Sequence, residues 1–127
     1  MKLEYLPDGS LDCPLIRLYD FGANEATKLR QYVNKLANGS SNKYALHHLD
    51  FIQSIDDCQL DFVVGEKDKG ILTTTMANQF ICVLSQESWE WVGELIEPFC
   101  QIARSNTYQW LDETSNISLL FSPSGYW

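Results

Sequence analysis

Residues 86–103 of the chain read QESWEWVGELIEPFCQIA, and this stretch decides the fold because it has the spacing of an amphipathic helix. With successive residues placed at steps of about 100°, one broad face of this helix is apolar. That face carries Trp89, Val92, Leu95, Ile96, Phe99, Cys100 and Ala103. The opposite face carries Glu87, Glu90, Glu94 and Glu97. A helix with two such faces needs an apolar core beneath it, so the chain is predicted to fold.

Trp91 belongs to neither of these faces. On the helical wheel it lies beside Glu87 and Glu94, where a side chain is normally half exposed. A tryptophan among glutamates is a candidate contact for another molecule. The alternative is that Trp91 lies flat along the flank of the helix, against Pro98, and covers the edge of the core. The spacing leaves both interpretations open.

The ends of this helix carry their own signals. Ser85 is a good N-cap, and Glu87 in the first turn suits the positive end of the helix dipole. Pro98 conflicts with the pattern because it lacks a backbone donor and disfavours helix at the preceding residue. We therefore expect either a kink within residues 94–98 or a second short helix after it.

The rest of the chain predicts one further helix and several short strands. The helix is expected over residues 25–37, with Asn24 as its N-cap and Gly39 as its C-terminal stop. Strands are expected over residues 2–6, 15–20, 44–49, 51–55, 59–64, 71–75, 79–84, 108–111 and 117–122.

Short loops join most consecutive strands, which favours antiparallel pairing. Residues 59–64 and 71–75 are expected to form a hairpin over the charged loop 65–70, and residues 79–84 are expected to be central because they are the most apolar. Two helices can cover only one face of a sheet. The predicted fold class is α+β, with two layers: a mainly antiparallel sheet and two amphipathic helices packed on one of its faces.

Length and composition predict a single domain over residues 1–127. Apolar residues make up 45% and aromatic residues 13% of the 127 positions, which is enough for a core. No apolar run approaches the roughly 18 residues of a membrane span. The first residues lack the apolar stretch of a signal peptide. The expectation is a soluble cytoplasmic protein with no membrane partner.

The formal net charge of −8 bears on the choice of partner. It repels phosphate backbones, so no nucleic-acid partner is expected. A basic protein partner remains possible, although solubility alone also accounts for the charge.

The four cysteines are Cys13, Cys58, Cys82 and Cys100. Their wide spacing and the absence of an export signal favour free thiols over disulfides. Cys82 and Cys100 lie in apolar segments and are expected to be buried.

Motifs for catalysis or metal binding are weak. His47 and His48 are adjacent in a predicted strand and should point to opposite faces, which disfavours one shared metal ion. Asp56, Asp57 and Asp61 cluster near a turn without the spacing of a calcium loop. The glycines stand singly, without a phosphate-binding motif. We therefore predict no catalytic residue, no metal site and no cofactor.

The aromatic side chains give the remaining functional lead. Trp89 and Trp110 are expected in the core, whereas Trp91, Tyr126 and Trp127 are candidates for exposed contacts. The predicted interaction residues are Trp91, Glu87, Glu94, Tyr126 and Trp127. The leading hypothesis is a non-catalytic protein–protein interaction module that also forms a homodimer.

Two alternatives remain open. One is a small-ligand binder or enzyme with a pocket between sheet and helices, using His47, His48, Asp57, Asp61 or Cys58. A thiol nucleophile would need Cys58 or Cys82 beside a histidine. The other alternative is an acidic inhibitor of a basic protein, which rests on the net charge and the glutamate stripe of residues 86–103.

Two stretches carry a resemblance to known sequences. Residues 8–21 read DGSLDCPLIRLYDF, and the C-terminal part has QWL at 109–111 and LLFSPSGYW at 119–127. These stretches resemble the two ends of a small uncharacterised bacterial protein family. The resemblance covers about a quarter of the chain and implies a bacterial, cytoplasmic protein, but it implies no activity.

Overall fold

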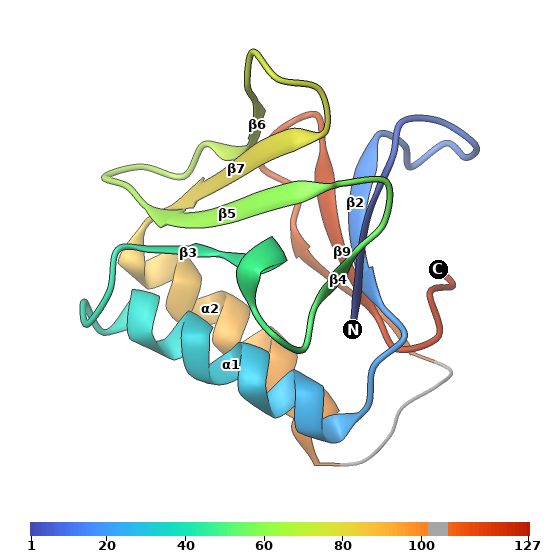
Figure 1. Ribbon diagram of the computed structural model, residues 1–127. Helices are drawn as coiled ribbons and strands as arrows, with labels where there is room; N and C mark the ends of the chain where they lie inside the picture. The colour runs from blue at the N-terminus through green and yellow to red at the C-terminus, as the bar shows by residue number, and fades with distance from the viewer. Residues whose placement is uncertain (102–106) are drawn as a thin grey trace.

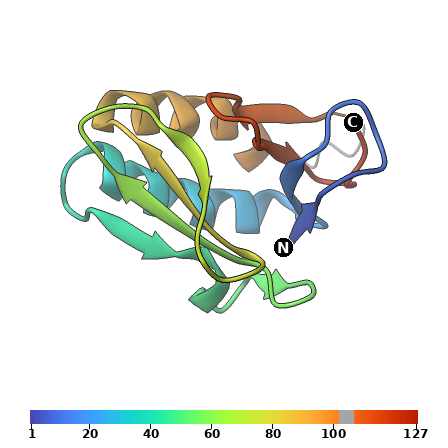
Figure 2. The same cartoon turned by 90° about the horizontal axis from the view of Figure 1, so that it is seen from above.

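The computed structural model describes residues 1–101 and 107–127, and over these residues the chain is an α+β protein with two helices and two mixed sheets (Figure 1). The helices α1 (Ala23–Ala37) and α2 (Gln86–Ile96) pack side by side and cover one face of the second sheet (Figures 1 and 2). Within the described residues, no helix is long and apolar enough to cross a membrane.

The first sheet is built from both ends of the chain. Its strands in spatial order are β4 (Gln53–Ser54), β1 (Lys2–Leu6), β2 (Leu15–Tyr19), β9 (Ser118–Ser122) and β8 (Gln109–Asp112). β8 and β9 pair antiparallel, as the short loop between the predicted strands 108–111 and 117–122 favours. β2 and β9 come from opposite ends of the chain and pair in parallel. β1 and β4 are also parallel.

The second sheet contains the middle of the chain. Its strands in spatial order are β3 (Lys43–Ala45), β5 (Gln59–Val64), β7 (Gln79–Leu84) and β6 (Gly70–Thr73). The predicted hairpin of β5 with β6 is wrong, because β7 lies between them, parallel to β5 and antiparallel to β6. The most apolar strand is thus central, as predicted, and it has two neighbours to pair with. The single, mainly antiparallel sheet of the prediction is therefore matched only in part.

Residues 43–55 also differ from the prediction of two strands. Only three residues extend as β3, and the chain then turns through the 3-10 helix η1 (Leu46–His48). Leu46 is fully buried, so this turn places one apolar side chain in the core, while β4 keeps only two residues. In a strand over residues 44–49, successive side chains would instead have pointed to opposite faces of the sheet.

The two predicted helices are present with small changes at their ends. α1 begins at Ala23, so the N-cap is Gly22 and not Asn24; the Glu25 carboxylate accepts a hydrogen bond from the Gly22 backbone N–H. Asn38 is the C-cap, and Gly39 follows with φ of +81°, a left-handed value that favours glycine.

α2 begins as predicted, with the Ser85 hydroxyl accepting a hydrogen bond from the backbone N–H of Ser88. It ends at Ile96, and the second short helix follows as η2 (Glu97–Cys100), with Pro98 in its first turn. The predicted extension to Ala103 lies outside the described residues.

The core lies between the helices and the two sheets. From α2 it takes Trp89, Val92 and Ile96, all almost completely buried, and from η2 it takes Phe99. The Trp89 ring lies 4.6 Å from the Phe62 ring of β5. The predicted apolar face of α2 is therefore confirmed at its centre, while Leu95 and Cys100 are only half-buried.

The four cysteines are free thiols, as predicted. Cys82 is buried, but the expectation for Cys100 is wrong, because η2 turns that side chain partly toward solvent. Cys58 is buried instead.

Candidate functional site

Two tryptophans, two residues apart on α2, have opposite environments. Trp89 is fully buried, and its indole Nε1 donates a hydrogen bond of 3.1 Å to the backbone oxygen of Val63. Trp91 keeps 59% of its surface exposed, although a large apolar side chain is normally buried. The expectation that Trp91 lies outside the core is therefore confirmed.

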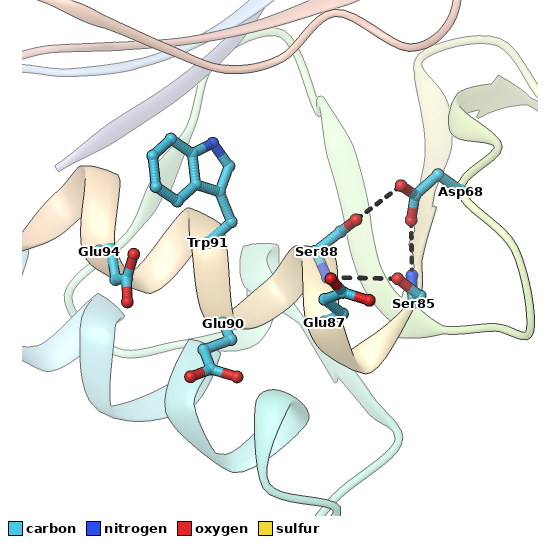
Figure 3. Close-up of a pocket in the computed structure, with 7 residues that line it drawn as sticks. All are labelled: Asp68, Ser85, Glu87, Ser88, Glu90, Trp91 and Glu94. Atoms are coloured by element: carbon cyan, nitrogen blue, oxygen red, sulfur yellow. Dashed lines mark hydrogen bonds between the residues drawn. The ribbon is translucent and has the colours of Figure 1, made fainter.

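Three exposed glutamates, Glu87, Glu90 and Glu94, lie on the turns of the same helix next to Trp91, and the Trp91 ring points away from the Glu90 carboxylate (Figure 3). We define the acidic–aromatic surface as Glu87, Glu90, Trp91 and Glu94. These residues line an open pocket of about 610 Å³ together with Asp68, Ser85 and Ser88. The helical repeat places them together, because side chains three and four residues apart are neighbours. The surface combines one large apolar ring with several negative charges.

A second pocket lies on the other side of Trp91, between α2 and β8. Its volume is about 360 Å³, and Trp91, Ser88 and Asp68 line both pockets. The β8 side of this pocket includes Gln109, Trp110, Leu111 and Asp112. Trp91 therefore borders two neighbouring pockets, with 59% of its surface exposed. Trp110 is only half-buried here, so its assignment to the core is correct only in part.

Asp68, in the loop between β5 and β6, fixes the beginning of α2. Its carboxylate accepts hydrogen bonds from the Ser85 backbone N–H at 2.9 Å and from the Ser88 hydroxyl at 2.6 Å (Figure 3). The bond from Ser85, followed by that from Ser88, lowers the pKa of Asp68. No local pattern indicates a role for Asp68, because its partners lie 17 and 20 positions away in the chain.

Replacing Asp68 by alanine should lower the free energy of unfolding by about 1 kcal/mol, because two donors at the helix N-terminus lose their charged acceptor. The folded pKa is lowered, so this stabilisation is present above the ordinary pKa of the carboxyl group and is lost as the pH falls through the folded value. Urea unfolding of the wild type and the variant at neutral and acidic pH measures both effects. Glu66→Ala in the same loop is the control, and an equal loss in that variant would contradict the assignment.

The predicted C-terminal residues lie elsewhere. Tyr126 is 80% exposed, whereas Trp127 is half-buried and its Nε1 donates to the Asp12 carboxylate at 3.1 Å. The Ser122 hydroxyl donates to the backbone oxygen of Tyr126. The end of the chain thus folds back on the loop between β1 and β2. Neither aromatic residue lines the two pockets beside Trp91.

The histidines do not point to opposite faces, which corrects the prediction from strand geometry. They lie in η1, where the two rings approach to 4.3 Å between centroids. His47 Nδ1 accepts a hydrogen bond from the Leu60 backbone N–H at 3.2 Å. Burial, followed by the nearby His48, lowers the pKa of His47.

Of the other residues of the ligand or enzyme alternative, Asp61 lies close enough to His47 for its charge to oppose the lowering of the His47 pKa. Asp61 pairs with Lys43 at 3.3 Å. Burial raises the pKa of the Cys58 thiol to about 12, so this sulfur is protonated and weakly nucleophilic at neutral pH. Within residues 1–101 and 107–127, no group of three or more histidine, cysteine, aspartate or glutamate side chains could hold a metal ion.

Acidification should destabilise the fold through His47. Its folded pKa is lowered, so the stabilisation is present above the unfolded pKa of about 6.5 and is lost as the pH falls through the folded value. His47→Asn keeps an acceptor for the Leu60 N–H but does not titrate. Thermal unfolding at mildly alkaline and mildly acidic pH should show a larger drop in Tm for the wild type. Equal drops in the two proteins would contradict this role.

Comparisons with protein-family models, curated proteins and solved structures found no match for this chain.

Proposed function

We propose that this protein is a non-catalytic interaction module that binds a basic segment of a partner protein through the acidic–aromatic surface of α2. The observation that carries the proposal is Trp91, an indole ring with 59% of its surface exposed among three glutamates. Tryptophan is among the residues that most often dominate binding energy at protein interfaces. Its polar N–H and broad apolar ring suit a site that is dry on one side and wet on the other.

The charges of the surface favour a cationic partner. Glu87, Glu90 and Glu94 are exposed, and the whole chain carries a net charge of −8. Carboxylates in this arrangement attract lysine and arginine side chains over a distance and increase the association rate. A cation that reaches the surface can also lie over the Trp91 ring, which is the best aromatic acceptor for a cation–π contact.

The same charges argue against a two-fold contact of α2 with α2 of a second copy. In such an interface each patch faces itself, so the glutamates of the two chains would approach one another. Like charges opposite each other at an interface cost free energy. A surface of opposite charge is therefore the better occupant of this site.

The test is a titration with a fluorescent synthetic peptide of alternating lysine and alanine residues. The wild type should bind it with an affinity that falls steeply with salt, because exposed charges are screened at high ionic strength. Glu87→Gln, Glu90→Gln and Glu94→Gln together should raise the Kd at least tenfold, about 1.4 kcal/mol.

A matched control removes the same number of charges elsewhere. Asp8→Asn, Asp56→Asn and Asp57→Asn change exposed carboxylates of two turns away from α2. This variant should bind the peptide within about twofold of the wild type, a small change on the free-energy scale. If both triple variants weaken binding equally, the net charge and not the acidic–aromatic surface is responsible, and the proposal fails.

A further inference from the structure

A pocket of the opposite character lies on the other helix. It has a volume of about 280 Å³ and is formed by α1 and the segment that joins η1 to β4. We define the basic–aromatic pocket as Lys28, Gln31, Tyr32, Lys35, Asp50 and Phe51. The rings of Tyr32 and Phe51 stack with 6.3 Å between centroids and an interplanar angle of 24°, so they provide an apolar wall.

The two lysines of this pocket are held over these rings. Lys28 Nζ lies 5.7 Å from the centroid of Phe51, and Lys35 Nζ lies 5.5 Å from that of Tyr32. Both lysines are exposed, and in the described part of the chain neither forms an ion pair. Asp50 supplies one carboxylate against these two cations. The pocket therefore has the composition that the acidic–aromatic surface requires of its partner.

The two sites occupy opposite flanks of the helix pair. Seen from above, α1 lies between α2 and the segment from η1 to β4 (Figure 2). The basic–aromatic pocket opens on the side of α1 next to that segment, whereas Trp91 lies on the side of α2 next to β8. One molecule cannot bring its own two sites together, but neighbouring molecules can.

We propose that the occupant of the acidic–aromatic surface is the basic–aromatic pocket of a second copy of this chain, an inference that rests on the proposed function of α2. In this contact the Trp91 ring packs against Tyr32 and Phe51, and Lys28 and Lys35 meet Glu87 and Glu94. Each cation then exchanges water for carboxylates and for the face of an indole ring.

The position of the two sites sets the form of the assembly. The contact is heterologous, because different patches of the two copies meet, and each copy keeps one free patch of each kind. With the patches on opposite flanks, association continues into a ring or an open chain and does not stop at a closed two-fold dimer. The homodimer expected from the sequence is thereby replaced by a head-to-tail assembly.

Light scattering over a concentration series tests the proposal, at about 0.01 M and about 1 M ionic strength, where the screening lengths are about 30 Å and about 3 Å. The wild type should exceed the mass of a dimer at low salt and dissociate at high salt. Lys28→Glu with Lys35→Glu should weaken association at least tenfold, and so should Glu87→Lys with Glu94→Lys. All four positions are exposed, and circular dichroism checks that each variant is folded.

The decisive experiment exchanges the charges of the acidic–aromatic surface and the basic–aromatic pocket. The chain with all four substitutions, or an equal mixture of the two double variants, should associate again, because opposite charges then face each other across the same contact. A wild type that remains monomeric or stops at a dimer overturns the proposal, and so does a folded fourfold variant that does not recover. If the wild type stays monomeric but binds the lysine–alanine peptide through α2, only this inference fails; if peptide binding by α2 is also absent, the proposed function fails with it.

Discussion

Trp89→Ala should lower the free energy of unfolding by about 3–5 kcal/mol, the range for deleting a large aromatic side chain from a core. Trp89 is fully buried and lies against Phe62, so the truncation leaves a cavity between α2 and β5. It also leaves the Val63 backbone oxygen without its indole donor. Chemical denaturation followed by circular dichroism gives the free energy.

Trp89→Phe separates the two contributions in this prediction. Phenylalanine keeps an aromatic ring in the core but cannot donate to Val63, so the loss should be intermediate, about 1–3 kcal/mol. A loss below about 1 kcal/mol in Trp89→Ala would mean that α2 does not anchor the core through this residue.

Trp91→Ala should have the opposite profile. It should weaken binding of the lysine–alanine peptide by about 2 kcal/mol, roughly 30-fold, because it removes the main apolar contact of the acidic–aromatic surface. Its effect on the free energy of unfolding should stay within about 0.5 kcal/mol, as for most exposed positions. Peptide titration and denaturation of the same variant measure both quantities.

The alternative interpretation of Trp91 makes a different prediction for the same variant. If the ring covers the edge of the core, Trp91→Ala should cost about 3–5 kcal/mol of folding stability while peptide affinity is unchanged. The 59% exposure of the side chain favours the first outcome. Trp91→Phe retains a ring and should recover part of the binding.

The elements that the sequence predicts well are those defined by local patterns. The faces of α2 follow from the spacing of its apolar residues, and Ser85 marks its first turn. β5 and β7 have the predicted bounds because both are dense in strand-forming residues. The burial of Trp89 and the exposure of Trp91 follow from the same helical repeat, so the central part of the candidate site was predictable.

The pairing of strands that are not consecutive in the chain was not predictable, because it depends on contacts between distant segments. Nothing local distinguishes a hairpin of β5 with β6 from the observed insertion of β7 between them. β2 and β9 pair although about a hundred residues separate them in the chain. Residues 46–48 have the composition of a strand, but burial of Leu46 in the core favours a 3-10 turn and brings both histidines to one side.

The residues that support the site could not be predicted from the sequence for the same reason. Asp68 reaches Ser85 and Ser88 only because the loop between β5 and β6 lies against the beginning of α2. Phe51 meets Tyr32 only because the segment after η1 returns to α1. In each case the two partners are far apart in the chain, so no local pattern connects them.

The role of Trp91 as the contact residue can be tested by nuclear magnetic resonance. The indole N–H signals of the four tryptophans are followed during titration with the lysine–alanine peptide. Trp89, bonded to Val63, and Trp127, bonded to Asp12, serve as internal controls. If Trp91 is the contact residue, its signal should show a saturable shift while these two signals stay nearly unchanged. A Trp91 signal that does not move at saturating peptide, or that moves no more than that of Trp127, would contradict it.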